Sequence, residues 1–205
     1  MEAALNRRLP VVRLSLLDSI SQAPHRSSET EKTMTELREL TKADVARFRS
    51  VRLLGLQESP AAFGASYAQE ERMPIEELSK RLVGTADRWV LGAFKDDDLV
   101  GVIGFIRESS EKSRHKGFIW GMYVIPEFRR QGVGRALFRE SLARIDSLIG
   151  LRQVVLSVVT TNVGALRLYE EFGFRTYGEE ADALCIDGSF HAEFHMVRRT
   201  QSGSF

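Results

Sequence analysis

The chain is organised around the segment VIPEFRRQGVGRAL, which runs from Val124 to Leu137. It continues an apolar segment, FIWGMYV at residues 118–124, which predicts a strand. Pro126 has no N–H to donate to a sheet and therefore ends strand pairing. Beyond Gly132 and Gly134, apolar residues recur at intervals of four, three and four, a spacing typical of an amphipathic helix. These residues are Phe138, Leu142, Ile145 and Ile149.

A strand, a glycine-containing turn and a helix start together form an anion site. The backbone N–H groups in the first turn of a helix have no intrahelical partner, and the helix dipole adds partial positive charge there. Gly132 and Gly134 lack the Cβ atoms that would keep a phosphate away from those N–H groups. Arg129, Arg130 and Arg135 add charge around the same point. The stretch therefore predicts a pyrophosphate-binding turn.

Two common phosphate-binding loops do not fit this turn. A Walker A loop ends in Gly-Lys-Ser/Thr, whereas Gly134 is followed by Arg135 and Ala136. A dinucleotide fingerprint needs a third glycine where this chain has Leu137. The remaining pattern, Arg129-x-x-Gly132-x-Gly134, resembles the acetyl-CoA pyrophosphate loop of the GCN5-related N-acetyltransferase (GNAT) superfamily.

A second stretch strengthens this resemblance. Residues 154–159 read VVLSVV, a β-branched run that predicts a buried strand. A short helix follows and ends at Gly173, a residue type common just after helix ends. The pattern Asn162-x-x-Ala165-x-x-x-Tyr169-x-x-x-Gly173-Phe174 resembles the second GNAT signature. Its start lies 28 residues beyond Gly134, which leaves room for one helix and one strand.

The order of predicted elements indicates an α+β fold. Strands and helices are mixed rather than alternating, which favours a mostly antiparallel sheet flanked by helices. The resemblance covers residues 35–199 and implies a mixed, strongly twisted sheet of the GNAT type. In such a sheet the strands at 118–124 and 154–159 run parallel and splay apart at the cofactor site.

The resemblance also implies an activity, which is transfer of an acetyl group from the cosubstrate acetyl-CoA to a primary amine in a ternary complex. Tyr169 matches the tyrosine that protonates the departing thiolate as general acid, and without the motif it would be interpreted as a core residue. The residues expected to hold acetyl-CoA lie at the end of the first strand, in the turn and at the second signature: Met122, Val124, Arg129, Arg130, Gln131, Gly132, Val133, Gly134, Arg135 and Asn162. Asn162 is equally suited to capping its helix.

The general base and the acceptor stay open at this stage. Glu70, Glu71, His115 and Glu193 are candidate bases, and a water chain is an equal alternative. The acceptor is a small-molecule amine or a protein amine. The alternative function is a non-catalytic acyl-CoA-binding module. A homodimer is compatible with the resemblance.

Composition narrows the class of protein. The chain has 205 residues, with 29 basic and 28 acidic side chains, so no net field favours a nucleic acid or an anionic membrane as partner. A single cysteine, Cys185, excludes an internal disulfide and favours a reducing, cytoplasmic location. No Cys/His spacing suggests a metal site. Residues 1–33 differ from the rest in composition, and we expect them to be a non-core extension preceding an acetyltransferase domain at 34–205.

Overall fold

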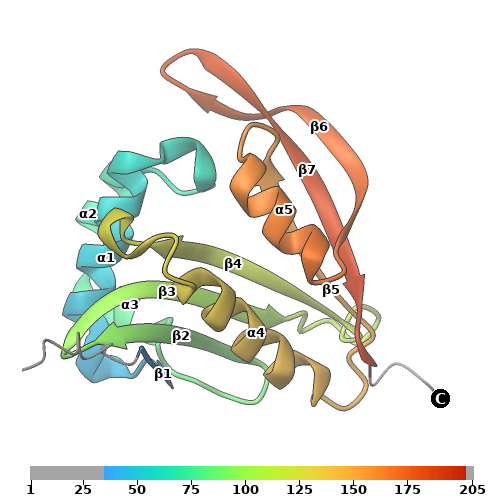
Figure 1. The fold of residues 1–205 in the computed structure, drawn as a ribbon, viewed down its shortest axis with the longest axis horizontal. Coiled ribbons are helices and arrows are strands. Elements are labelled where there is room, and N and C mark those ends of the chain that lie inside the picture. The colour runs from blue at the N-terminus through green and yellow to red at the C-terminus, as the bar shows by residue number, and fades with distance from the viewer. Residues whose placement is uncertain (1–34, 202–205) are drawn as a thin grey trace, which may run out of the picture. The chain divides into compact units, whose positions relative to one another are not determined.

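The computed structural model of the protein describes residues 35–201. In this part of the chain, seven strands form one sheet in the order β1-β2-β3-β4-β5-β7-β6 (Figure 1). Every neighbouring pair is antiparallel except β4 and β5, which run parallel. The predicted α+β fold with a mixed, mostly antiparallel sheet is therefore confirmed. The prediction for residues 1–33 lies outside the described residues.

The first half of the sheet is a run of antiparallel neighbours. The apolar segments of β2 and β3 form a hairpin whose turn contains Asp96, a residue in the left-handed region with φ of 53°. The bounds of the four strands are β1 Glu36–Glu39, β2 Arg88–Lys95, β3 Asp98–Arg107 and β4 Lys116–Val124.

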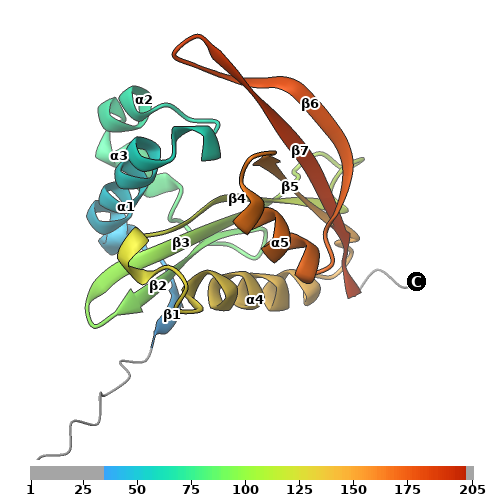
Figure 2. The same cartoon turned by 45° about the horizontal axis from the view of Figure 1, so that its top comes forward.

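Helices cover both faces of this half-sheet. In Figures 1 and 2, α1, α2 and α3 lie on one face and α4 lies across the other. The side chains of β3 alternate accordingly, because Val102 packs in the cluster that includes α1 whereas Ile103 and Phe105 pack in the cluster that includes α4. The helix bounds are α1 Val45–Glu58, α2 Tyr67–Arg72, α3 Ile75–Lys80 and α4 Val133–Asp146.

The second half of the sheet rises away from the first and carries α5 beside it (Figure 2). Helix α5 ends as the sequence predicts, because Gly173 has a φ of +85° and Phe174 donates its N–H to the Tyr169 carbonyl at 3.0 Å, closing a Schellman motif. The hairpin of β6 and β7 turns at Asp187 and Gly188, both with positive φ. The bounds are β5 Gln153–Val159, α5 Val163–Glu171, β6 Arg175–Ile186 and β7 Ser189–Arg199.

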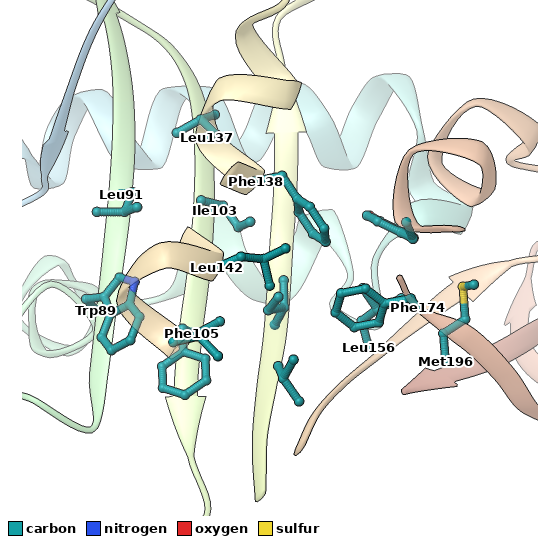
Figure 3. Packing of buried hydrophobic residues seen from close by; sticks show 14 of the residues in the cluster. Trp89, Leu91, Ile103, Phe105, Leu137, Phe138, Leu142, Leu156, Phe174 and Met196 are labelled. Atoms are coloured by element: carbon teal, nitrogen blue, oxygen red, sulfur yellow. The ribbon is translucent and has the colours of Figure 1, made fainter. Parts of the chain in front are cut away.

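An aromatic cluster joins the two halves on the α4 face (Figure 3). Phe138 on α4 is fully buried, and its ring centroid lies 5.1 Å from that of Tyr169 and 5.6 Å from that of Phe174. Burying one such ring contributes roughly 1.5–3 kcal/mol to stability. The prediction for Ile149 is wrong: its side chain is 92% exposed, because α4 ends at Asp146 before its apolar stripe returns to the sheet.

The parallel strands β4 and β5 separate early. They pair only from Lys116 with Gln153 to Phe118 with Val155, after which β4 runs on to Val124 without pairing to β5. Just beyond this point the register of β4 against β3 shifts around Gly121, whose φ is +62°. The predicted splay between the two strands is therefore confirmed.

No helix in the range 35–201 has both the length and the apolar character that crossing a bilayer requires.

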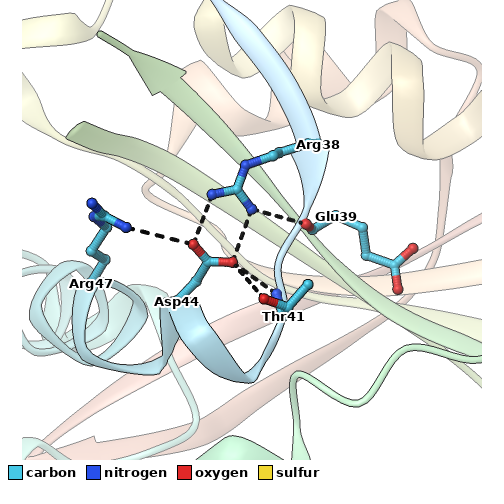
Figure 4. Close-up of polar contacts among 5 residues, drawn as sticks. All are labelled: Arg38, Glu39, Thr41, Asp44 and Arg47. Atoms are coloured by element: carbon cyan, nitrogen blue, oxygen red, sulfur yellow. Dashed lines mark hydrogen bonds and ion pairs between the residues drawn. The ribbon is translucent and has the colours of Figure 1, made fainter. Parts of the chain in front are cut away.

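A buried carboxylate fixes the entry to α1 (Figure 4). Asp44 is 3% exposed and accepts hydrogen bonds from the Arg38 guanidinium at 2.7 and 2.9 Å and from the Thr41 backbone N–H at 2.9 Å. The Arg38 hydrogen bond and the Thr41 backbone N–H outweigh burial and hold the pKa of Asp44 well below its usual range. Asp44 therefore ties β1 to α1.

Replacing Asp44 with Asn should lower the free energy of unfolding at neutral pH by about 1.5–3 kcal/mol, because the charged hydrogen bonds are lost. A depressed folded-state pKa stabilises the native state fully above the unfolded-state pKa of roughly 3.9, and this stabilisation is lost as the pH falls through the folded-state value. Urea unfolding should thus show the wild-type advantage shrinking below about pH 4. The exposed turn variant Asp97→Asn is the control, and a constant advantage down to pH 3 would contradict this assignment.

Candidate functional site

Two cavities open where β4 and β5 separate. The first, of about 760 Å³, lies between the end of β4, the end of α1 and the start of α5. The second, of about 330 Å³, lies between β4, β5 and the segment that follows α1. Met122 and Tyr169 line both cavities, so they stand at the boundary between them.

Tyr169 reaches this boundary because its position on α5 faces the core. Its side chain is 8% exposed, and burial raises the pKa of its hydroxyl to about 12. The polar contact of the hydroxyl is a weak one, to Met122 Sδ at 3.8 Å. The hydroxyl is therefore protonated at neutral pH and available to a molecule that occupies either cavity.

The glycine-containing turn leads directly into α4. Gly132 is the N-cap of α4 with a φ of +84°, and α4 then begins at Val133. Arg130 also has a positive φ, of 60°. A Cβ on Gly134 would lie 3.3 Å from Met122 Cε and 3.6 Å from the Val124 side chain, both of which line the first cavity. Gly134 therefore packs against two side chains that line the first cavity, although residues 130–136 are not themselves among its lining residues.

Arg129 is held by the protein itself. Its guanidinium pairs with both carboxylate oxygens of Glu58, with Nη1 at 2.6 Å from Oε1, and its Nε donates to the Val124 carbonyl at 2.9 Å. Glu58 also accepts the Tyr123 hydroxyl at 2.8 Å. The Arg129 hydrogen bond is the main cause of a lowered pKa of Glu58. Arg129 therefore links the end of α1 to the end of β4, a role that sequence reasoning missed.

The other polar residues of the turn are Gln131, Arg135 and Arg130, and each lies in a different environment. The side-chain oxygen of Gln131 accepts from Lys95 at 2.7 Å, and its amide nitrogen donates to the Glu127 carbonyl at 2.8 Å. Arg135 forms an ion pair with Glu171 on α5. Arg130 is exposed on the surface of the turn.

Asn162 caps α5. Its side-chain oxygen accepts the Ala165 N–H at 3.1 Å, which is one of the two roles that the sequence allows for it. Asn162 and Ala165 also line the first cavity. The cap therefore sets where the first turn of α5 lies against that cavity.

The second cavity contains one of the four candidate bases. Glu193 on β7 lines it, and burial raises the pKa of this carboxyl group, with a smaller opposing effect from His195. Glu70 is buried in ion pairs with Arg52 and Arg81, at 2.8 and 2.7 Å. Neither Glu71 nor His115 lines the first or the second cavity.

Sequence reasoning also missed Ser157, which lines the second cavity from β5. Its side chain interrupts the otherwise apolar run VVLSVV, and this is the signal that points to it in the sequence. Its hydrogen-bond partner on β7 depends on the strand register, which a single sequence does not reveal.

The chain is similar in sequence to known proteins. The family model described as Acetyltransferase (GNAT) family matches residues 53–174. A probable spermine N(1)-acetyltransferase from Bacillus subtilis subsp. natto is 27% identical over 93 residues, which are 43% of this chain and 60% of that protein. The L-amino acid N-acetyltransferase AaaT of Escherichia coli is 24% identical over 129 residues, which are 63% of this chain and 74% of that protein.

A solved structure shares the fold. It is yncA from Salmonella typhimurium, described as a putative acetyltransferase with its cofactor acetyl-CoA. The TM-score is 0.69 at 16% identity, over 84% of this chain and 97% of the other.

Proposed function

The chain belongs to the acetyltransferase (GNAT) family, and on this basis we propose that it is an N-acetyltransferase that transfers the acetyl group of acetyl-CoA to a primary amine within a ternary complex. The observation that carries the proposal is the pair of cavities that meet at Met122 and Tyr169. Direct transfer needs two substrates that approach one reacting centre from opposite sides, and two cavities that share Met122 and Tyr169 would allow this.

Acetyl-CoA would occupy the first cavity. The first-turn N–H groups of α4, at Val133, Gly134 and Arg135, would receive the pyrophosphate together with the side chain of the exposed Arg130. The edge of β4 that leaves β5 after Phe118 would pair with the amides of the pantetheine arm at Met122 and Val124. Arg129 would not act on the phosphate alone. It would also hold this edge of β4 in place, because its guanidinium pairs with Glu58 and donates to the Val124 carbonyl.

The acyl transfer itself needs a proton donor for sulfur. When the amine attacks the thioester carbon and the C–S bond breaks, negative charge develops on the CoA sulfur. The Tyr169 hydroxyl lies at the boundary of the two cavities and is protonated at neutral pH, so it would donate a proton or a hydrogen bond to that sulfur. A backbone N–H of β4 would stabilise the oxyanion formed at the carbonyl.

The amine would enter through the second cavity. The charges beyond this cavity limit the class of amine that can serve as acceptor. A third cavity, of about 360 Å³, shares Arg52, Phe118 and Trp120 with the second and is also lined by Arg81 and Arg88. One carboxylate, Glu70, faces two of these three guanidinium groups. This end of the acceptor path is therefore net positive and favours acceptors that carry a single ammonium group over polyamines.

A screen of amine acceptors that measures CoA release tests the proposed function. We expect turnover with monoamines, including amines that carry an apolar group or a carboxylate, and at least ~10-fold lower kcat/KM with spermine and spermidine because a second cation is repelled by the arginines. Preference for a polyamine would overturn the acceptor argument. Acetyl-CoA binding without turnover on any amine would instead favour a non-catalytic acyl-CoA-binding module.

The variant Gly134→Asp tests the pyrophosphate site. A carboxylate at this position would repel the pyrophosphate, so acetyl-CoA binding should weaken at least ~10-fold, about 1.4 kcal/mol. The same charge in the first turn of α4 favours the helix dipole, so the variant should stay folded. Calorimetry measures the affinity. The matched control is Gly134→Ala, which adds the Cβ without the charge and should therefore weaken binding less than the Asp variant; its methyl group meets the flexible end of Met122 at 3.3 Å. Unchanged affinity in a folded Asp variant would refute the site.

The variant Tyr169→Phe tests the proton donor. The ring keeps its contacts with Phe138 and Phe174, and the lost hydroxyl makes a weak 3.8 Å contact with sulfur, so stability and acetyl-CoA affinity should change little. Single-turnover kinetics at saturating acetyl-CoA should show a rate lower by roughly 10²-fold if general-acid catalysis operates. Transfer at the wild-type rate would make Tyr169 a packing residue.

A further inference from the structure

Three polar side chains form a hydrogen-bonded chain across β5, β7 and β6. Ser157 on β5 lies directly opposite His195 on β7, and its hydroxyl oxygen lies 2.9 Å from Nδ1 of the imidazole ring. Nε2 of the same ring lies 3.2 Å from a carboxylate oxygen of Glu180 on β6. The chain is thus held by three neighbouring strands of one sheet.

The partners of the ring determine its tautomer. An ionised carboxylate only accepts hydrogen bonds, so the contact with Glu180 places the ring proton on Nε2. In the neutral imidazole Nδ1 is then an acceptor, and the Ser157 hydroxyl donates its proton to it. The lone pairs of the Ser157 oxygen are left free to accept from another donor.

The chain leads from a cavity to the protein surface. Ser157 lines the second cavity together with Tyr169 and Glu193. The side chain of His195 is 30% exposed and that of Glu180 is 58% exposed. A proton taken up at Ser157 therefore has a short route to solvent.

We propose that Ser157, His195 and Glu180 form the relay that removes a proton from the acceptor amine, an inference that rests on the proposed acetyltransferase function. The ammonium nitrogen gives its proton to the Ser157 oxygen as the serine proton passes to His195 Nδ1. Glu180 stabilises the resulting imidazolium, which later releases its proton to solvent. The neutral amine then attacks the thioester carbon, the C–S bond breaks, and the second nitrogen proton reaches the CoA sulfur through Tyr169.

The chemistry of the amine explains why such a relay is needed. A primary alkylamine has a pKa of ~10.4, so only about one molecule in 2,500 is neutral at pH 7. The titratable groups that face the ring are Glu180 and Tyr177 on β6 and Glu193 on its own strand.

The kinetic test compares His195→Gln and Ser157→Ala with the control His191→Gln, which lies on the same face of β7 outside the relay. The measurement is single-turnover acetyl transfer at saturating acetyl-CoA from pH 6 to pH 10, with an amine identified in the acceptor screen. Both relay variants should lose roughly 10²-fold at neutral pH. The deficit should close as the pH approaches the pKa of the amine, and acetyl-CoA affinity should not change. The control should keep the wild-type profile.

Three results would overturn the relay. The first is a wild-type pH profile in His195→Gln. The second is a loss seen only in Glu193→Gln, which would make Glu193 the base. The third is an acetyl group located on Ser157 by peptide mass spectrometry after mixing with acetyl-CoA alone, which would make Ser157 a nucleophile.

Nitrogen NMR of the histidine rings tests the geometry without any acceptor, so it separates failure of the relay from failure of the proposed function. In the full-length protein at neutral pH, the His195 signals, assigned by their loss in His195→Gln, should show the Nε2–H tautomer, and Nδ1 should shift in Ser157→Ala. A ring protonated on Nδ1 instead, or an Nδ1 signal insensitive to Ser157, would refute the relay.

Discussion

The site depends on where the pairing between β4 and β5 ends. Parallel strands that kept their ladder to the end of β4 would leave no space between them, but here the ladder stops at Phe118. Beyond it, the shifted register around Gly121 turns β4 away, and a Cβ at this glycine would meet Arg52 Nη1 at 2.9 Å. The two cavities, the free strand edge and the position of Tyr169 follow from this separation.

Side chains hold the separated strands in place from both directions. On the α1 side, Glu58 joins Arg129 and Tyr123, so the end of β4 is fixed to the end of α1. On the α4 side, the rings of Phe138, Tyr169 and Phe174 pack together and fix α5 against α4. The opening between the strands is therefore supported by a hydrogen-bonded link on one wall and by an apolar cluster on the other.

The sequence predicts the parts of this arrangement that are local. The turn before α4 and the glycine that ends α5 depend on a few adjacent residues, and both are found where the motifs place them. The 3.6-residue period correctly puts Phe138 and Leu142 in the core, but it does not say where the helix stops, and so it fails for Ile149. The family resemblance assigns roles to Asn162 and Tyr169, and both residues line the first cavity.

The sequence does not predict the contacts between segments that lie far apart along the chain. The partner of Arg129 lies 71 residues away on α1, and no local pattern connects the two. The hydrogen bond between Ser157 and His195 requires the register of β5 against β7, which depends on packing across the whole sheet. Alternation does place Glu193 and His195 on one face of β7, but only the fold shows that this face meets the second cavity.

Hydrogen exchange of the full-length protein with and without acetyl-CoA tests the proposal that acetyl-CoA lies in the opening between β4 and β5. Exchange should slow in three separate segments, at residues 120–124, 130–136 and 162–166, because bound cofactor would cover the free edge of β4 and the first turns of α4 and α5. Exchange at the distal hairpin turn, residues 186–189, should not change. Protection confined to other segments, or bound acetyl-CoA with no protection at these three, would refute this placement of the cofactor.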